Sequence, residues 1–380
     1  MIRNVKALTA SSFFSMFFVG ITAVIIGAAA TNIGLLPHQI GLLMSIQNVG
    51  FIIAVIISGS LADTYEKPKL LFIGSLVLAA AYFLFYKHPS FLLNMLIMFF
   101  MGAGIGVYEG VLDAMLLDIH KKNESRYIII NHLFVTLGGL AITVYLIFLQ
   151  MNWRRSVIQA SIAVFLVAIF YFLARLKIET KGMDRFKDRL GFLRKQKVIV
   201  LLFIAAICAV GYELGNIGIM TTFLMELRGF DQITSKIALV LFISGTAVGR
   251  IIAGIFIKNE KILKTIILLF GLSTIFISCV YFTNVGRFIY VFVFFSGMSV
   301  SALVPLIIAI TGLTYKDISG TAMGVIKLAM PIGGVLIPFT HSLLTKYVSF
   351  EKSLLLFPVI MAVSFIILLM NRKEFQTGNS

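Results

Sequence analysis

The sequence predicts an all-α membrane protein with twelve transmembrane helices in two six-helix bundles, the second repeating the first in the same orientation. Hydrophobic residues make up 59% of the chain and charged residues 13%, and the mean hydropathy is +1.02, whereas soluble domains are about 45–50% apolar. Twelve apolar stretches are long enough to cross the ~30 Å hydrocarbon core of a bilayer. The glycine pattern of the first half also recurs in the second.

The apolar stretches are separated mostly by short polar connections. They lie at about 8–33, 38–62, 69–86, 91–117, 127–150, 156–176, 198–225, 235–257, 262–283, 288–314, 319–345 and 353–371. Most of the Lys and Arg residues fall in the connections on the side of the two termini. Positively charged loops are typical of the cytoplasmic side. We therefore expect both termini in the cytoplasm and the chain in a cell membrane, either a bacterial inner membrane or a plasma membrane.

One connection is long and basic. It divides the chain into an N-terminal bundle at 1–176, a cytoplasmic basic linker at 177–197 and a C-terminal bundle at 198–380. Because basic segments beside membrane spans are attracted to anionic lipid headgroups, we expect this linker to lie along the membrane surface. A specific binding role is the alternative.

An internal repeat appears when the sequence is shifted by 195 residues. Glycines then coincide at Gly20 and Gly215, Gly34 and Gly229, Gly50 and Gly245, Gly59 and Gly254, Gly102 and Gly297, Gly138 and Gly333, and Gly139 and Gly334. About one coincidence is expected by chance. An even number of helices separates the copies, which gives them the same orientation. Since the first apolar stretch is part of the repeat, we interpret it as a span and not as a cleaved signal peptide.

Two acidic residues lie inside the fourth apolar stretch. Glu109 and Asp113 are four residues apart and therefore share a helix face with Gly102 and Gly106. A carboxylate at membrane depth costs about 2.5–3.5 kcal/mol and usually faces a water-filled cavity or a partner. We expect the pair to bind protons or substrate. A structural ion pair with a basic residue on a neighbouring helix is the alternative.

A second titratable pair follows from the repeat. His132 in the fifth span and Lys327 in the eleventh are related by the shift of 195 residues, so we expect them to flank the cytoplasmic half of a central cavity. His132 suits a proton relay, with packing as the alternative. The ammonium group of Lys327 needs neutralisation by Glu109, Asp113 or an anionic substrate.

Further polar candidates lie in the seventh and second spans. Glu213, with Tyr212 and Asn216 beside it, is expected at mid-depth of the cavity, with an interhelical hydrogen bond as the alternative. Gln47 and Asn48 could donate hydrogen bonds to a polar solute, and helix packing is the equal alternative.

The segment from Gly59 to Lys69, GSLADTYEKPK, is similar to the G-x-L-A-D-R-x-G-R-K signature of the major facilitator superfamily. This resemblance implies the major facilitator fold and a gating role for Gly59 and Asp63, with Asp63 at the N-terminus of the eleventh helix near Gly320. A helix dipole favours an anion at that position. The repeat has Lys258 in the place of Asp63, so the sequence predicts a single such latch. Arg250 resembles a residue that recurs in the superfamily, which suggests gating or a structural role.

Within that superfamily, the chain weakly resembles sugar/proton symporters of the fucose permease type. The motifs that carry this resemblance are Gly333-Gly334-Val335-Leu336-Ile337-Pro338 and Pro305-Leu306-Ile307. Those symporters have a Glu in helix 4, where Glu109 lies, and an Asp in helix 1, where this chain has Phe17 and Phe18. The resemblance implies uptake of a small polar solute together with protons.

The functional prediction is a secondary transporter that works by alternating access. We expect a small-molecule substrate such as a sugar, with Glu109 or Glu213 as the proton site. The expected partners are protons and the lipid bilayer, without nucleic acid, and the expected oligomeric state is monomeric. The sequence has no Walker motif to bind ATP, and we expect no enzymatic activity, cofactor or metal.

Two other functions stay open. The Phe-rich and Met-rich spans would suit a proton-driven exporter of amphipathic drugs, siderophores or lipids. A receptor that resembles a transporter but does not translocate is less expected, because only ten residues follow Met370.

Overall fold

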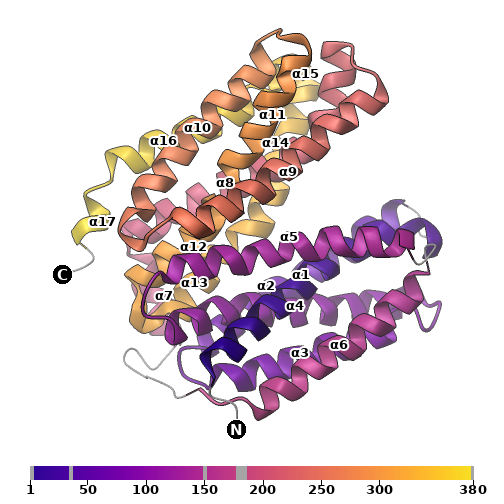
Figure 1. Cartoon of the computed structure of the whole chain (residues 1–380), viewed down its shortest axis with the longest axis vertical. Coiled ribbons are helices and arrows are strands. Elements are labelled where there is room, and N and C mark those ends of the chain that lie inside the picture. The colour runs from indigo at the N-terminus through magenta and orange to yellow at the C-terminus, as the bar shows by residue number, and fades with distance from the viewer. Residues whose placement is uncertain (1–3, 34–36, 149–151, 177–185, 378–380) are drawn as a thin grey trace. The chain divides into compact units, whose positions relative to one another are not determined.

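The computed structural model describes residues 4–33, 37–148, 152–176 and 186–377, and its elements are helices (Figure 1). Within these ranges, twelve segments are long and apolar enough to cross a membrane. The prediction of an all-helical protein with twelve membrane spans is therefore confirmed.

The helices follow the predicted spans closely. The first half contains α1 (Val5–Ile33), α2 (Pro37–Leu61), α3 (Lys67–Leu84), α4 (Phe91–Ile119), α5 (Glu124–Phe148), α6 (Trp153–Leu173) and the short α7 (Phe186–Arg194). The second half contains α8 (Lys197–Arg228), α9 (Gln232–Phe256), α10 (Ile262–Phe282), α11 (Ile289–Val300), α12 (Leu303–Thr314), α13 (Ser319–Lys327), α14 (Ala329–Tyr347), α15 (Phe350–Ser353), α16 (Leu356–Met370) and α17 (Glu374–Thr377).

Three spans of the second half are interrupted, which was not predicted from the sequence. The tenth span breaks between α11 and α12, the eleventh breaks between α13 and α14, and the twelfth breaks between α15 and α16. A proline lacks the N–H group that would bond to the carbonyl four residues earlier. Pro305 therefore leaves the carbonyl of Ser301 without its helical donor, and Pro331 does the same to Lys327. The breaks in the tenth and eleventh spans lie at these freed carbonyls.

The internal repeat is visible in matching close contacts between helices. At four glycines the neighbouring backbone is so near that a β-carbon would clash with a carbonyl oxygen. The contacts are Gly50 with Phe99, Gly245 with Phe294, Gly102 with Gln47, and Gly297 with Phe242. A shift of 195 residues converts each contact of α2 with α4 into a contact of α9 with α11. The glycines recur because both copies need the same close packing.

The chain forms two compact units. The first comprises Met1–Lys122, Ile130–Gly191 and Tyr315–Lys327, and the second comprises Asn123–Ile129, Phe192–Thr314 and Leu328–Ser380. In the first unit, α13 packs on α2 and α4. The predicted division at 177–197 stays a prediction, and residues 177–185 of that linker lie outside the described part of the chain.

Candidate functional site

The first unit contains a buried cluster of charged side chains. Helix α4 presents Glu109 and Asp113 on one face, and the two residues are only 2% and 1% exposed. Helix α13 contributes Lys327, whose Nζ lies 2.6 Å from Glu109 Oε2 and 2.7 Å from Asp113 Oδ2. The same ammonium group donates to the backbone carbonyl of Glu109. Three of the predicted site residues therefore meet, and both carboxylates have a cationic partner.

Asp113 makes further polar contacts. Asn131 Nδ2 of α5 donates to Asp113 Oδ1 over 2.8 Å, and His132 Nε2 lies 3.1 Å from Asp113 Oδ2. Ser12 of α1 donates in turn to Asn131 Oδ1 over 3.0 Å. Asn131 was not among the predicted site residues, although it precedes His132 directly and is a polar residue within an apolar span.

The two carboxylates differ in how well they are hydrogen-bonded. Both oxygens of Asp113 have partners, whereas Glu109 Oε2 touches the ammonium group of Lys327 outside hydrogen-bond geometry. A protonated Glu109 would therefore give up fewer contacts than a protonated Asp113.

The cluster also has the donor atoms of a metal site. One ligand atom each from Glu109, Asp113 and His132 lies within 4.8 Å of the others. However, the ammonium group of Lys327 contacts both carboxylates. A metal ion would have to displace this ammonium group, so the arrangement suits an ion-pair cluster better than a metal centre.

The second unit holds another ion pair, which is partly buried. Arg250 Nη2 of α9 lies 3.3 Å from Glu213 Oε1 of α8. Arg250 Nε also donates over 3.1 Å to the carbonyl of Ser301, which Pro305 leaves without its helical donor. This contact gives Arg250 a structural role at the break in the tenth span. Its predicted gating role stays a prediction.

Tyr212 and Asn216 are fully buried and bonded within the second unit. The hydroxyl of Tyr212 is 2.5 Å from Ser296 Oγ. Asn216 donates to the carbonyl of Tyr212 over 2.7 Å and accepts from the hydroxyl of Tyr281 over 2.5 Å. These contacts favour packing roles for both residues.

The two polar candidates of α2 have different environments. Gln47 is 7% exposed and donates to the carbonyl of Thr22 over 3.2 Å, which joins α2 to α1. Asn48 is exposed and donates to the carbonyl of Met44 in its own helix over 3.0 Å. Neither side chain joins the charged cluster.

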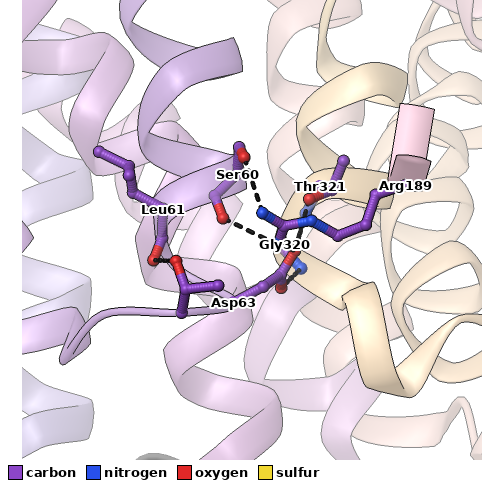
Figure 2. Close-up of polar contacts among 7 residues, drawn as sticks. Ser60, Leu61, Asp63, Arg189, Gly320 and Thr321 are labelled. Atoms are coloured by element: carbon purple, nitrogen blue, oxygen red, sulfur yellow. Dashed lines mark hydrogen bonds and ion pairs between the residues drawn. The ribbon is translucent and has the colours of Figure 1, made fainter. Parts of the chain in front are cut away.

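Asp63 forms a clasp with the N-terminus of α13 (Figure 2). It accepts hydrogen bonds from the backbone N–H groups of Gly320 and Thr321 over 2.8 and 2.9 Å, and from Thr321 Oγ1 over 2.5 Å. The helices can approach this closely because Gly59 has no side chain, and a β-carbon there would lie 2.8 Å from the carbonyl oxygen of Gly320. Asp63 thus lies where the resemblance implied.

The linker helix α7 supplies a third part of this clasp. Arg189 is 2% exposed, and its Nη1 lies 2.9 Å from Asp63 Oδ2 and donates over 3.0 Å to the carbonyl of Ser60 (Figure 2). The prediction that the linker lies along lipid headgroups is therefore wrong at this position. Nothing in the sequence distinguishes Arg189 from the neighbouring exposed basic residues.

The carboxyl group of Asp63 is subject to two opposing effects. Burial raises its pKa above the ordinary value, whereas the hydrogen bonds from Thr321 and Gly320 and the charge of Arg189 act in the opposite direction. The contacts of the clasp therefore offset only part of the cost of removing this carboxylate from water, and its pKa stays raised.

A second clasp holds the N-terminus of α5, so the prediction of a single latch is wrong. Asn259 Oδ1 accepts from the backbone N–H of Ser125 over 3.2 Å and from its Oγ over 2.7 Å. Asn259 Nδ2 donates to Glu124 Oε2. Ser125 is the repeat mate of Gly320, whereas Asn259 lies one residue after Lys258, the repeat mate of Asp63. A lysine cannot accept an N–H bond, but the next residue can.

The chain matches a known protein family over most of its length. The family model of the Major Facilitator Superfamily matches residues 8–267 and 215–380. No curated protein matches the sequence.

Several solved structures have the same fold. The chain is similar to the fucose:proton symporter FucP of E. coli, with a TM-score of 0.81, 16% identity, and 97% of this chain and 99% of that chain covered. It is similar to the human organic anion transporter MFSD10, with a TM-score of 0.78, 12% identity, and coverage of 97% and 100%. It is also similar to the proton:xylose symporter XylE, with a TM-score of 0.71 and 11% identity. This match covers 96% of this chain and 95% of that chain.

Proposed function

Because the chain belongs to the Major Facilitator Superfamily and is thus a secondary transporter, we propose that it moves a small, sugar-like solute together with protons by alternating access. Two of the similar structures, FucP and XylE, are proton-coupled sugar symporters. The positive-inside pattern supports an orientation with both termini in the cytoplasm.

The observation that carries the proton-coupled part of this proposal is the charge of the buried cluster. Glu109, Asp113 and Lys327 are all buried, and with a neutral His132 their charges sum to one negative charge. A net charge away from water is unfavourable, and one bound proton would remove it. Glu109 is the proposed acceptor because its protonation gives up the fewest contacts.

The position of Lys327 suggests how proton binding is linked to movement. Lys327 is the last residue of α13, directly before the break in the eleventh span, and the boundary between the compact units falls after it. We propose that bending at this break changes the packing of α13 on α4, and with it the contact between the ammonium group and Glu109. The proton affinity of Glu109 then depends on the direction in which the transporter opens.

Transport into proteoliposomes tests this function. The purified protein is reconstituted with a pH-sensitive dye inside, and fucose, xylose, glucose and an organic anion are added in turn. We expect one sugar to acidify the lumen and to accumulate only while a proton gradient exists. Movement of the organic anion alone would support the exporter function, for which the similarity to MFSD10 is the specific observation. Sugar accumulation that survives an ionophore would contradict proton coupling.

Replacing Asp63 by alanine is expected to shift the transporter toward conformations open on the cytoplasmic side. The change removes the acceptor for two N–H groups at the N-terminus of α13 and the partner of Arg189. Loss of such a cap costs about 0.5–2 kcal/mol, which corresponds to a change of about 2- to 30-fold in the conformational equilibrium. Distances between spin labels on the cytoplasmic loops measure this shift.

Asp118 provides the matched control for this experiment. It lies on the same side of the membrane and pairs with the side-chain ammonium group of Lys67 at 2.6 Å, whereas Asp63 accepts hydrogen bonds from backbone N–H groups. Asp118→Ala should therefore leave the distance distributions unchanged. Equal shifts for both variants would show that charge alone, and not the clasp, determines the equilibrium.

The second clasp should act in the same direction with a smaller effect. Asn259→Ala removes uncharged acceptor contacts to Ser125, each worth about 0.5–1.5 kcal/mol. Asn259→Asp should be at least as harmful, because it brings a second carboxylate against Glu124. The double variant Asn259→Asp with Glu124→Gln restores one donor and one acceptor and should recover the original spin-label distances. A double variant no better than Asn259→Asp would contradict this clasp.

A further inference from the structure

A groove in the first unit lies apart from the charged cluster and both clasps. It has a volume of about 310 Å³ and is formed by α1, α5 and α6. Its apolar walls include Phe17 and Phe18 of α1 and Ala160 and Ala163 of α6. The small side chains of the two alanines keep the groove open between larger neighbours.

One end of the groove is polar. Ser156 lines it and is 3% exposed, and its Oγ has no hydrogen-bond partner among the described residues. Beside it, the hydroxyl of Tyr145 donates to Gln159 Oε1 over 2.8 Å. A buried hydroxyl without a partner is unfavourable and uncommon, so rotation of the Ser156 side chain toward the groove would allow a ligand atom to complete a hydrogen bond.

The depth of this polar end matches the interfacial region of a bilayer. Helix α6 starts at Trp153, a residue type typical of membrane interfaces. With a rise of about 1.5 Å per residue, Ser156 and Gln159 lie about 5 and 9 Å farther along the helix axis. The glycerol and ester groups of phospholipids occupy this level, between the headgroups and the hydrocarbon core.

A cation stands above the groove on the same helix stripe. Arg155 is exposed and lies one helical turn before Gln159, so the two side chains share a face of α6. A guanidinium group recognises phosphate oxygens well. From the interface inward, the stripe thus offers a phosphate contact, a hydrogen-bond contact and an apolar surface.

The groove also has an apolar continuation along α1 and α6. A second groove of about 500 Å³ shares Ala163 with the first and includes Phe14 and Leu166. Phe14 and Leu166 are 45% and 61% exposed within membrane spans, which indicates a surface in contact with lipid. A hydrocarbon chain can therefore extend from the polar end along the transmembrane direction.

We propose that this groove binds one anionic glycerophospholipid of the leaflet opposite the termini. Arg155 contacts its phosphate, Ser156 donates to a glycerol or ester oxygen, and one acyl chain packs between Phe17, Phe18 and Ala160. None of Glu109, Asp113 and Lys327 lines this groove, and the lipid proposal does not depend on the proposed function.

Native mass spectrometry of the detergent-purified full chain, titrated with phosphatidylglycerol, tests the proposal. Wild-type protein should retain one tightly bound phosphatidylglycerol. Arg155→Gln and Ala160→Phe should each weaken this binding by about tenfold, the first by removing the phosphate contact and the second by filling the groove. Ser156→Ala should weaken it less.

Ile162→Phe is the matched control, because Ile162 is 58% exposed on the same helix and does not line either groove. It should change lipid binding less than twofold. The thermal unfolding of each variant identifies any general loss of folding. A stably folded Ala160→Phe variant that retains the lipid as wild type would overturn the proposal, as would an equal loss of binding in the Ile162→Phe control.

A phospholipid with a photoreactive acyl chain gives a measurement that needs no substitution. In nanodiscs, its crosslinks should concentrate on the groove residues of α1, α5 and α6. Crosslinks spread evenly over the exposed spans would overturn the proposal, because they would indicate bulk lipid only.

Discussion

Replacing Lys327 by methionine is expected to destabilise the protein by about 3–5 kcal/mol, a large fraction of the free energy of unfolding of a typical protein. Methionine fills similar space but leaves Glu109 and Asp113 buried without their shared cation. The two carboxylates would then repel each other in a region with little water. Thermal unfolding of the purified variant in detergent, followed by circular dichroism, measures the loss.

A combined variant separates charge from packing in this experiment. Lys327→Met with Glu109→Gln and Asp113→Asn removes all three charges and should regain most of the lost stability. The exposed Lys258 serves as the control position, where the same change to methionine should have little effect. Unchanged stability of the single Lys327 variant would mean that the ion pairs contribute little to the fold.

Glu109→Gln is expected to abolish accumulation of solute while preserving exchange. Glutamine keeps the size of the side chain but cannot release a proton, and Lys327 retains Asp113 as a partner. Occupancy by a proton is then no longer linked to the conformational cycle. The ratio of internal to external sugar should fall to about one under a proton gradient, while exchange between equal sugar pools continues.

Two other acidic residues define the alternatives to this result. Asp113→Asn should lower the melting temperature, because Asp113 also contacts Asn131 and His132. If Glu213→Gln abolishes accumulation and Glu109→Gln does not, the proton site lies in the second unit. If the Glu109→Gln protein unfolds as readily as the Lys327→Met variant, Glu109 forms a structural ion pair and is not the proton site.

Patterns of a single residue type allowed a large part of the architecture to be predicted. Runs of apolar residues determine the spans, and glycines such as Gly50 and Gly102 recur because close helix packing excludes side chains. The meeting of Glu109 with Lys327 was weighed as one of several pairings, since burial requires a partner but does not specify which one. No sequence pattern predicted that Arg250 donates to the carbonyl of Ser301, because this contact depends on the missing backbone N–H group of Pro305.

Two kinds of contact could not be predicted from the sequence. One is made by a residue next to the position that the repeat alignment indicates, and the other by a residue of the basic linker whose composition does not distinguish it from its neighbours. The second clasp uses Asn259 in place of the aligned Lys258, because the acceptor atom and not the alignment determines the contact. Arg189 comes from a linker whose other described basic residues are exposed, and only the folded chain brings it to Asp63. The amino-acid composition also does not identify the transported solute.

The contact between Arg250 and the tenth span constrains the order in which mutations can accumulate in a lineage. If Arg250 is lost while Pro305 is present, the chain passes through an intermediate whose Ser301 carbonyl has lost its side-chain donor inside an apolar span. If Pro305 is lost first, the backbone amide returns and the guanidinium group keeps Glu213. Descendants that keep this proline should therefore keep the arginine, whereas descendants without the proline are free to retain or lose it.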